Sequence, residues 1–214
     1  MENILLIGAG QHANVVIYNA LEQNKYNIVG IIDKYKENIG TNISGIPIVG
    51  ADDIEHSVLM DKFKTNKFFI GLGDMKIRKK LYDYYISNGW EAVNIIHPNA
   101  IVSKSAKLGK GILIECGCLI TPNPVIGDNV VINTGSQVNH DNIIEDNVYI
   151  ASGVILSGGV RIEEGTLLDD GVIITLGRNV GKNCIIGAGS VVTKNIDENM
   201  IAYGNPCKVI RNNM

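Results

Sequence analysis

The sequence predicts two architectures in series, a small Rossmann-like α/β domain and then a left-handed parallel β-helix of hexapeptide repeats. Short apolar runs alternate with helical stretches in the first half of the 214-residue chain. Aliphatic residues recur at every sixth position in the second half, which also holds most of the 24 glycines. We therefore expect one domain at residues 1–97 and a second, including the C-terminal tail, at residues 98–214.

Strand and helix patterns alternate along the first domain. The strands are apolar runs that end in a glycine or an acid, and the helices show the apolar spacing typical of helices. The expected elements are strands at residues 4–10, 27–33 and 67–73, helices at residues 11–24 and 74–89, and a closing segment at residues 92–97. Because a full NAD-binding domain normally doubles the βαβαβ unit, this half is short for one.

A glycine turn connects the first strand to the first helix. The run from Gly8 to Ala13 fits the pattern G-x-G-x-x-[G/A], and Asp33 ends the next strand, which is the context of the dinucleotide fingerprint. Glycines let a phosphate approach the backbone, and the N-terminus of a helix favours its charge. This predicts a nucleotide or sugar-nucleotide site at the strand ends; the alternative is a tight turn that binds nothing. His12 lies in this turn, where it either touches a ligand or has a capping or solvated role.

The second domain repeats every six residues without interruption. An α-helix would repeat every 3.6 residues and a flat strand every two, so this period indicates a hexapeptide β-helix. Three hexads form one triangular coil of 18 residues, with the aliphatic side chains inside and glycine or polar residues at the corners. The aliphatic series is Val102, Leu108, Ile114, Ile120, Ile126, Ile132, Val138, Ile144, Ile150, Leu156, Ile162, Leu168, Ile174, Val180, Ile186 and Val192.

One His-Asp pair lies at a corner of this prism. Of the four histidines, only His140 is followed directly by a carboxylate, that of Asp141. Residues 18 apart stack on neighbouring coils, about 4.8 Å apart. The two columns at this corner are Pro122, His140, Gly158 and Leu176, and Asn123, Asp141, Gly159 and Gly177. Because glycines follow the pair in both columns, we expect an open notch through which a substrate reaches the imidazole.

A histidine at such a corner is suited to act as a general base. The unperturbed pKa of histidine is near neutrality, and an adjoining carboxylate stabilises an imidazolium. A hexapeptide coil has no pocket of its own, and such prisms usually associate as trimers whose grooves form the sites. We therefore expect a homotrimer. The alternative is a polar turn, because Asn, His and Asp side chains also bond locally to the backbone.

Composition argues against several classes of function. A net charge of −3 does not indicate a nucleic-acid or anionic-membrane surface. We find no apolar run near the roughly 20 residues of a membrane span, and because the sequence starts directly with a strand we expect no signal peptide. Cys116, Cys118, Cys184 and Cys207 lack zinc-site spacing. We therefore expect reduced thiols, no metal and a cytoplasmic protein.

These features together resemble the bacterial sugar O/N-acyltransferases, which include sialic-acid O-acetyltransferases and nucleotide-amino-sugar N-acetyltransferases. The resemblance rests on the G-x-G-x-x-A turn, the unbroken hexapeptide helix carrying NHD and the tail YGNPCKVIR, and it covers essentially the whole chain. It implies transfer of an acetyl group from acetyl-CoA to the amine of a nucleotide-linked sugar, in surface glycan biosynthesis. Acetylation of a hydroxyl of sialic acid or another sugar is the alternative.

The resemblance also implies roles for particular residues. His140 is the general base, and Asp141 tunes it. Acetyl-CoA lies along the prism in the trimer groove, against Tyr149, Asp170 and Ala188. The sugar nucleotide is cradled by residues of the first domain, namely Gly10, Gln11, His12, Asp33, Lys34 and Gly73.

Two positions depart from the family pattern. Tyr149 stands where relatives often have a second histidine, and phenols do not titrate near neutrality. Relatives often have two acids after the second strand, whereas this chain has Asp33 and then Lys34. The lysine either pairs with a phosphate or is solvated, which leaves the identity of the nucleotide open.

Two rival functions use the same architectures. A γ-type carbonic anhydrase needs three zinc-binding histidines, but the repeat holds only His140, with His97 just outside it. A non-enzymatic NAD-sensing or scaffold protein would use the glycine turn and would not bind acetyl-CoA.

Overall fold

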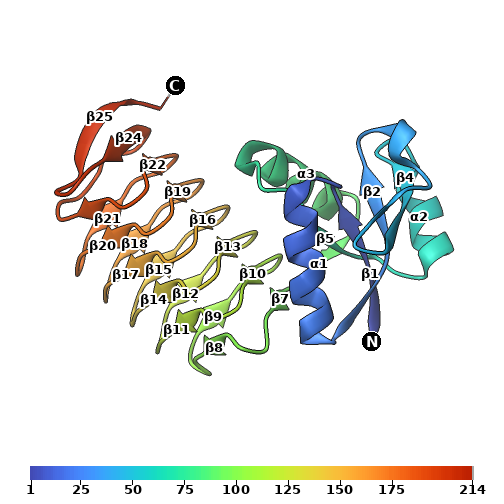
Figure 1. The fold of residues 1–214 in the computed structure, drawn as a ribbon, viewed down its shortest axis with the longest axis horizontal. Helices are drawn as coiled ribbons and strands as arrows, with labels where there is room; N and C mark the ends of the chain where they lie inside the picture. Colours follow the sequence, from blue (N-terminus) through green and yellow to red (C-terminus); the bar gives the residue numbers. More distant parts are fainter. Residues whose placement is uncertain (214) are drawn as a thin grey trace. The chain divides into compact units, whose positions relative to one another are not determined.

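A computed structural model of the chain describes residues 1–213, which form two compact units divided between Ile95 and Ile96 (Figure 1). Each unit has its own hydrophobic core. Within the described residues, no helix has both the length and the apolar character needed to cross a bilayer.

The division lies two residues before the boundary that the sequence suggests. Ile95 and Ile96 form β7, which already belongs to a sheet of the β-helix. Ile96 stands six residues before Val102, so the aliphatic period starts one step earlier than the series given above. The N–H of His97 also donates to the carbonyl of Ile114 in the next coil, at 2.9 Å.

The first unit is a six-stranded sheet in the order β3-β4-β2-β1-β5-β6. Strand β3 pairs antiparallel with β4, and the other pairs are parallel. The elements are β1 (Glu2–Ile7), α1 (Gln11–Gln23), β2 (Tyr26–Asp33), η1 (Lys36–Asn38), β3 (Asn42–Ile43), β4 (Ile46–Ala51), α2 (His56–Phe63), β5 (Lys67–Ile70), α3 (Met75–Ser87) and β6 (Glu91–Ala92). This is the expected Rossmann-like arrangement, in which helices connect parallel strands.

The strand order creates a topological switch point between β1 and β5. Strand β1 pairs with β2 on one side and with β5 on the other, so the chain leaves the middle of the sheet in two directions. Ligands of open α/β sheets bind at such a point, outside the carboxyl ends of the strands. The loops that follow β1 and β5 carry Gly10 and Gly73, which places both predicted glycines at this edge.

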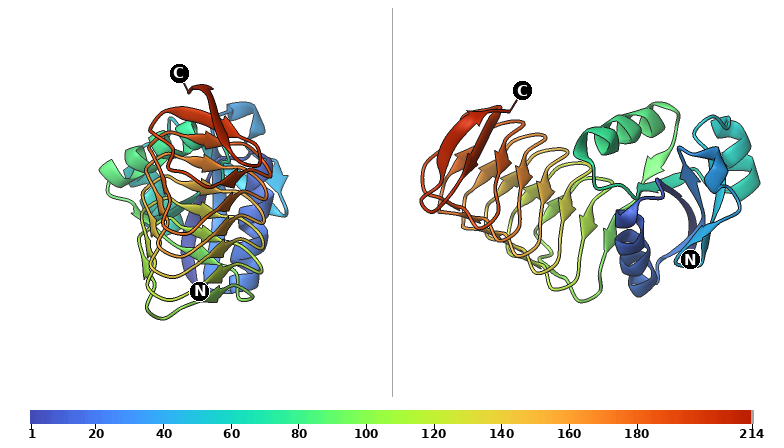
Figure 2. Two further views of the ribbon diagram at one scale, coloured as in Figure 1. Left: turned by 90° about the vertical axis from the view of Figure 1, so that its left-hand side faces the viewer. Right: turned by 45° about the horizontal axis from the view of Figure 1, so that its top comes forward.

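The second unit is a triangular β-helix whose coils are stacked in sequence order (Figures 1 and 2). The first face holds β7 (Ile95–Ile96), β10 (Leu113–Ile114), β13 (Val131–Ile132), β16 (Tyr149–Ile150), β19 (Leu167–Leu168), β22 (Ile185–Ile186), β24 (Met200–Tyr203) and β25 (Lys208–Asn212). The second face holds β8 (Ile101–Val102), β11 (Leu119–Ile120), β14 (Gln137–Val138), β17 (Ile155–Leu156), β20 (Ile173–Ile174) and β23 (Val191–Val192). The third face holds β9 (Lys107–Leu108), β12 (Val125–Ile126), β15 (Ile143–Ile144), β18 (Arg161–Ile162) and β21 (Asn179–Val180).

Turn residues explain the triangular cross-section. Every sixth residue from Gly111 to Gly189 has a positive φ, and each is Gly, Asn or Asp, the residues that adopt this conformation at low cost. Asp141, with φ of 59°, is the one carboxylate in that series. Between the turns, the aliphatic series faces inward, and residues such as Val138 and Leu156 are fully buried. The predicted left-handed parallel β-helix is confirmed.

Candidate active site

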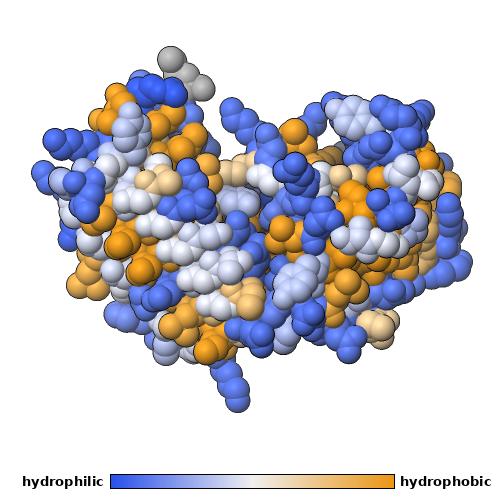
Figure 3. Space-filling view, viewed as in Figure 1, coloured by the Kyte–Doolittle hydropathy of each residue, from blue (hydrophilic) through white to orange (hydrophobic). Residues whose placement is uncertain are grey.

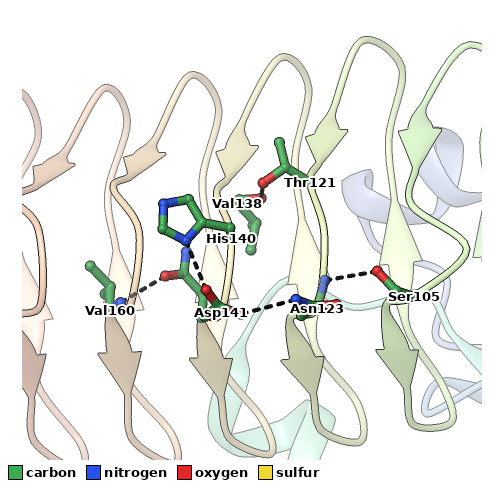
Figure 4. Close-up of polar contacts among 8 residues, drawn as sticks. Ser105, Thr121, Asn123, Val138, His140, Asp141 and Val160 are labelled. Atoms are coloured by element: carbon green, nitrogen blue, oxygen red, sulfur yellow. Dashed lines mark hydrogen bonds and ion pairs between the residues drawn. The ribbon is translucent and has the colours of Figure 1, made fainter.

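The His140–Asp141 pair lies in the turn between β14 and β15, at the corner between the second and third faces. The left-handed conformation of Asp141 turns its carboxylate back toward the preceding imidazole. His140 Nδ1 and Asp141 Oδ2 are 2.9 Å apart, and about 60% of each side chain is exposed, at 61% and 59% (Figure 4). The pair therefore projects from the prism and does not belong to its core.

The hydrogen bond fixes the chemical state of the pair. The bond with His140 and a second one with Asn123 hold the pKa of the Asp141 carboxyl below its ordinary value. An ionised carboxylate only accepts hydrogen bonds, so the imidazole must present its N–H at Nδ1. In the neutral ring, Nε2 then carries the lone pair that can accept a proton.

The imidazole lies over Gly158, the residue that follows it in the 18-residue column. A Cβ atom at position 158 would lie 2.3 Å from His140 Nε2 and 2.4 Å from Cε1. The two coils are held in register here, because the Gly159 N–H donates to the carbonyl of His140 at 2.9 Å. The notch expected from the sequence is thus occupied by the ring itself, and only a glycine leaves room for it.

Asn123 holds the other oxygen of the carboxylate. Its Nδ2 donates to Asp141 Oδ1 at 3.2 Å, and its backbone N–H donates to Ser105 Oγ at 3.0 Å (Figure 4). Below the pair, buried Asn142 accepts the N–H of Val160 at 2.7 Å and anchors the turn. The 18-residue column places Asn123 beside Asp141 in the sequence, and this column is the one sequence signal for its contact with the pair.

The three residues expected to contact acetyl-CoA lie on another side of the prism. Tyr149 is in β16 on the first face, and Asn133 Nδ2 lies 3.1 Å from its hydroxyl oxygen. Asp170 and Ala188 lie in neighbouring coils at the corner that follows the first face. Asp170 Oδ1 accepts the N–H of Ser152 at 3.0 Å, in the turn of the coil that contains Tyr149. The three residues therefore share one region of the surface.

His140 and Tyr149 do not share a corner within one chain. Strand β15 on the third face, and the turn after it, separate the two residues. Within one chain, the two residues therefore lie on different sides of the prism.

The predicted sugar-nucleotide residues of the first unit lie at the carboxyl edge of its sheet. Gly10 is the N-cap of α1, with φ of −75°, and a Cβ atom there would meet only Leu72, at 3.5 Å. A Cβ atom on Gly73 would lie 3.8 Å from that of His12. These positions therefore surround an open helix N-terminus, which is suited to a phosphate.

The end of β2 adds an acid to this edge. Asp33 is buried, and its Oδ2 accepts a bond from Asn38 Nδ2 at 2.6 Å. The Gly8 N–H donates to the carbonyl of Ile32 at 2.7 Å, which keeps the glycine turn beside this strand end. Lys34 is exposed, with its Nζ 5.5 Å from the ring centre of Tyr35. Gln11 is also exposed, at the start of α1.

His12 is held neutral. Burial, and then the nearby charge of Arg78, lower the pKa of His12 to about 4. Arg78, on α3, is itself buried; its Nη1 donates to the carbonyl of Ile70 at 2.7 Å, and the guanidinium lies 5.2 Å from the ring centre of Phe69. Sequence reasoning missed Arg78, because nothing in the pattern of α3 distinguishes a buried arginine from a solvated one.

Two of the four cysteines are buried in the core of the β-helix. Burial raises the pKa of the Cys118 thiol to about 11, and Cys118 and Cys184 are at most 1% exposed in the β-helix core. Both thiols therefore pack among the aliphatic side chains of the β-helix core. Within residues 1–213, no group of three or more His, Cys, Asp or Glu side chains is arranged to hold a metal ion.

Comparison with known proteins finds relatives along the whole chain. A variant of the perosamine N-acetyltransferase from Caulobacter crescentus, solved with CoA and GDP-perosamine, is 31% identical with a TM-score of 0.91, over 99% of this chain and 98% of that one. The acetyltransferase domain of PglB from Neisseria gonorrhoeae, solved with acetyl coenzyme A, is 28% identical with a TM-score of 0.87, over 98% of this chain and 99% of that one.

Two sequence comparisons agree with these structures. The family model of the PglD N-terminal domain matches residues 3–85. The UDP-N-acetylbacillosamine N-acetyltransferase of Bacillus subtilis is 32% identical over 118 residues, which are 53% of this chain and 51% of that protein. The match thus spans about half the length of this curated relative.

Proposed function

The chain belongs to the bacterial sugar O/N-acyltransferase family, and we propose that it transfers an acetyl group from acetyl-CoA to the amino group of a nucleotide-linked sugar. The observation that carries the proposal is the imidazole of His140, oriented by Asp141 and placed over Gly158. The N-acetyltransferase names of its relatives favour an amine over a hydroxyl as the acceptor.

The proposed chemistry needs alignment and one base. A thioester is already activated, so the enzyme has to hold a neutral amine against its carbonyl carbon. His140 Nε2 takes the proton of the amine as the C–N bond forms, which is typically worth about 10²–10⁴-fold in rate. The tetrahedral intermediate then expels the CoA thiolate, which takes the proton back from the imidazolium. The products are the N-acetyl sugar and CoA thiol, and Asp141 stabilises the cationic ring between the two transfers.

The first unit is proposed to bind the nucleotide. Gly10 and Gly73 leave the N-terminus of α1 open to a diphosphate, and Asp33 is placed to accept ribose hydroxyls. Neutral His12 beside them offers a hydrogen bond with no positive charge. The names of the relatives contain different nucleotides, UDP in one and GDP in another. The acceptors in the assay below therefore differ in their nucleobase.

We also propose that the enzyme is a homotrimer through its β-helix. His140 and the residues Tyr149, Asp170 and Ala188 lie on different sides of one prism, so a complete site requires a neighbouring chain. Apolar surface is exposed on the β-helix unit (Figure 3), and Leu176, in the column of His140, is 64% exposed. Burial of such surface favours association.

A cytoplasmic location fits the same proposal. All four cysteines are free thiols, and thiols persist in a reducing compartment. Fractionation of cells that express a tagged form would check this, and recovery outside the cytoplasm would contradict it.

A thiol-release assay tests the activity. The protein is incubated with acetyl-CoA and with UDP-, GDP- and dTDP-linked amino sugars, each paired with the analogue that has a hydroxyl in place of the amine. We expect CoA thiol release with at least one amine and an N-acetyl product by mass spectrometry. Acetylation of the hydroxyl analogues alone would reassign the enzyme as an O-acetyltransferase, and no thiol release with any acceptor would contradict the proposal.

A further inference from the structure

We propose that Asn123 is a positioning residue for His140, acting through Asp141. The proposal rests on the proposed role of His140 as general base. Asn123 has no direct contact with the imidazole; its Nδ2 donates to Asp141 Oδ1 at 3.2 Å, while Asp141 Oδ2 lies 2.9 Å from His140 Nδ1. One oxygen of the carboxylate thus accepts a hydrogen bond from the Asn123 amide, and the other is hydrogen-bonded to the imidazole of His140.

Asn123 is itself held in place by the coil before it. Its backbone N–H donates to Ser105 Oγ at 3.0 Å, and its φ of 69° puts it in the same left-handed turn position as Asp141. The side chains of Ser105, Asn123 and Asp141 therefore stack along one corner and end at the imidazole (Figure 4).

Exposure of the pair is the reason that a second donor matters. The side chains of His140 and Asp141 are 61% and 59% exposed. An exposed ion pair alone holds its geometry weakly. With Oδ1 held by Asn123, the carboxylate keeps Oδ2 toward Nδ1. When the carboxylate turns away, Nδ1 loses its acceptor, and the proton is free to reside on either ring nitrogen. Nε2 then presents its lone pair to a substrate for only part of the time.

Other asparagines at equivalent turn positions show what an ordinary stacking bond looks like. Asn129 Nδ2 donates to Asn147 Oδ1 at 2.8 Å, and Asn183 Nδ2 donates to Asn199 Oδ1 at 3.3 Å. These bonds join amide to amide, whereas the bond from Asn123 reaches a carboxylate that is itself bonded to an imidazole. The hydrogen bond from Asn123 therefore joins two neighbouring coils, as the other two bonds do, and also orients the proposed base.

A double-mutant cycle tests whether Asn123 acts through Asp141. Asn123→Gly and Asp141→Gly remove the side chains and keep the left-handed turns, because glycine adopts a positive φ freely. We expect Asn123→Gly to lower kcat about 3- to 10-fold, the effect of one net hydrogen bond, and to have no further effect in the Asp141→Gly background. Asn183→Gly, the same change in the same kind of turn, should leave kcat unchanged. Multiplicative effects in the double variant would overturn the proposal.

A measurement without substrate separates this proposal from the proposed function. Nitrogen-15 chemical shifts of the His140 ring, in protein labelled at histidine, report which nitrogen carries the proton. We expect the Nδ1–H form in the parent protein and in Asn183→Gly, and a mixture of both forms in Asn123→Gly. If Asn123→Gly keeps the Nδ1–H form, the positioning role is wrong whatever the reaction is. If the tautomer changes but no acetyl transfer is found, only the proposed function fails.

Discussion

The imidazole of His140 covers the α-carbon of Gly158 in the next coil so closely that a methyl group at position 158 would come within 2.3 Å of Nε2. The contact joins two residues that the hexapeptide period places one coil apart. It makes the glycine a condition for the orientation of the base, because any side chain there competes with the ring for the same space.

Replacement of this glycine is the first prediction. Gly158→Ala should displace the imidazole and lower kcat by at least about 10-fold, with unchanged affinity for acetyl-CoA. Gly158 does not need a positive φ, so alanine should cost the fold little beyond the clash. In the His140→Ala background, where the ring is gone, Gly158→Ala should change neither kcat nor the unfolding temperature. A further loss of activity in that background would show that the glycine acts in some other way.

Glycines of the first unit should separate into binding and folding roles. A Cβ atom at Gly10 makes only an ordinary contact, with Leu72 at 3.5 Å. Gly10→Val should therefore fold, obstruct the helix N-terminus and raise the KM for the sugar nucleotide about 10-fold or more. The KM for acetyl-CoA should hardly change. At Gly8, by contrast, φ is 98° and a Cβ atom would lie 2.4 Å from Leu72, so Gly8→Ala should lower the unfolding temperature. Equal increases of both KM values in Gly10→Val would contradict separate sites.

Stability should depend on pH through His12. The folded protein holds the pKa of His12 at about 4, while an unfolded chain binds that proton near pH 6.5. Between these values the unfolded chain binds a proton at His12 that the folded protein excludes. His12 therefore costs no stability above about pH 6.5, and the free energy of unfolding falls as the pH is lowered from there toward 4. Urea unfolding should show a loss on the order of 2 kcal/mol from this group between pH 7.5 and 5.

The variant His12→Gln identifies the source of that loss. It should remove the His12 share of the pH dependence and leave the smaller share of His56, whose pKa is also lowered by burial. His56 Nδ1 accepts the indole N–H of Trp90 at 2.8 Å, so its protonation breaks a bond that tryptophan fluorescence can follow. A pH dependence in His12→Gln equal to that of the parent would mean that His12 does not contribute.

Subunit complementation tests whether each site takes residues from two chains. His140→Ala lacks the base, and Ala188→Trp fills an exposed position of the expected acetyl-CoA region. Each variant alone should be nearly inactive. Trimers reassembled from equal amounts of both should recover about one quarter of the parent activity, because about a quarter of the interfaces then combine an intact base with an intact acetyl-CoA region. Mixed trimers with no activity, or a stable active monomer in sedimentation, would contradict the shared site.

The hexapeptide period made most of the β-helix predictable. The inward positions, the stacking of residues 18 apart and the place of His140 beside Gly158 all follow from a six-residue repeat that Val102 to Val192 keep without a gap. The start of the β-helix was harder to place, because Ile95 and Ile96 fit both a closing strand of the first domain and the first strand of the β-helix.

Interactions that depend on side-chain direction were not predictable in the same way. The column places Asn123 next to Asp141, but only coordinates show that the amide donates to the carboxylate oxygen that His140 leaves open. The low pKa of His12 depends on burial and on Arg78, which lies 66 residues further along the chain. No local sequence pattern predicts a contact between residues so far apart in the chain.

The central claim is that His140 is the base for acetyl transfer, and the turnover number of His140→Ala tests it most directly. Single-turnover and steady-state rates are measured with acetyl-CoA and the best sugar-nucleotide acceptor, and calorimetry checks acetyl-CoA binding. The account predicts a kcat about 10²–10⁴-fold below the parent, with acetyl-CoA affinity and trimer retained. Asp141→Asn should cost less, because the imidazole remains. Near-normal turnover of His140→Ala at every pH would contradict the account and leave the His-Asp pair as a polar corner of the prism.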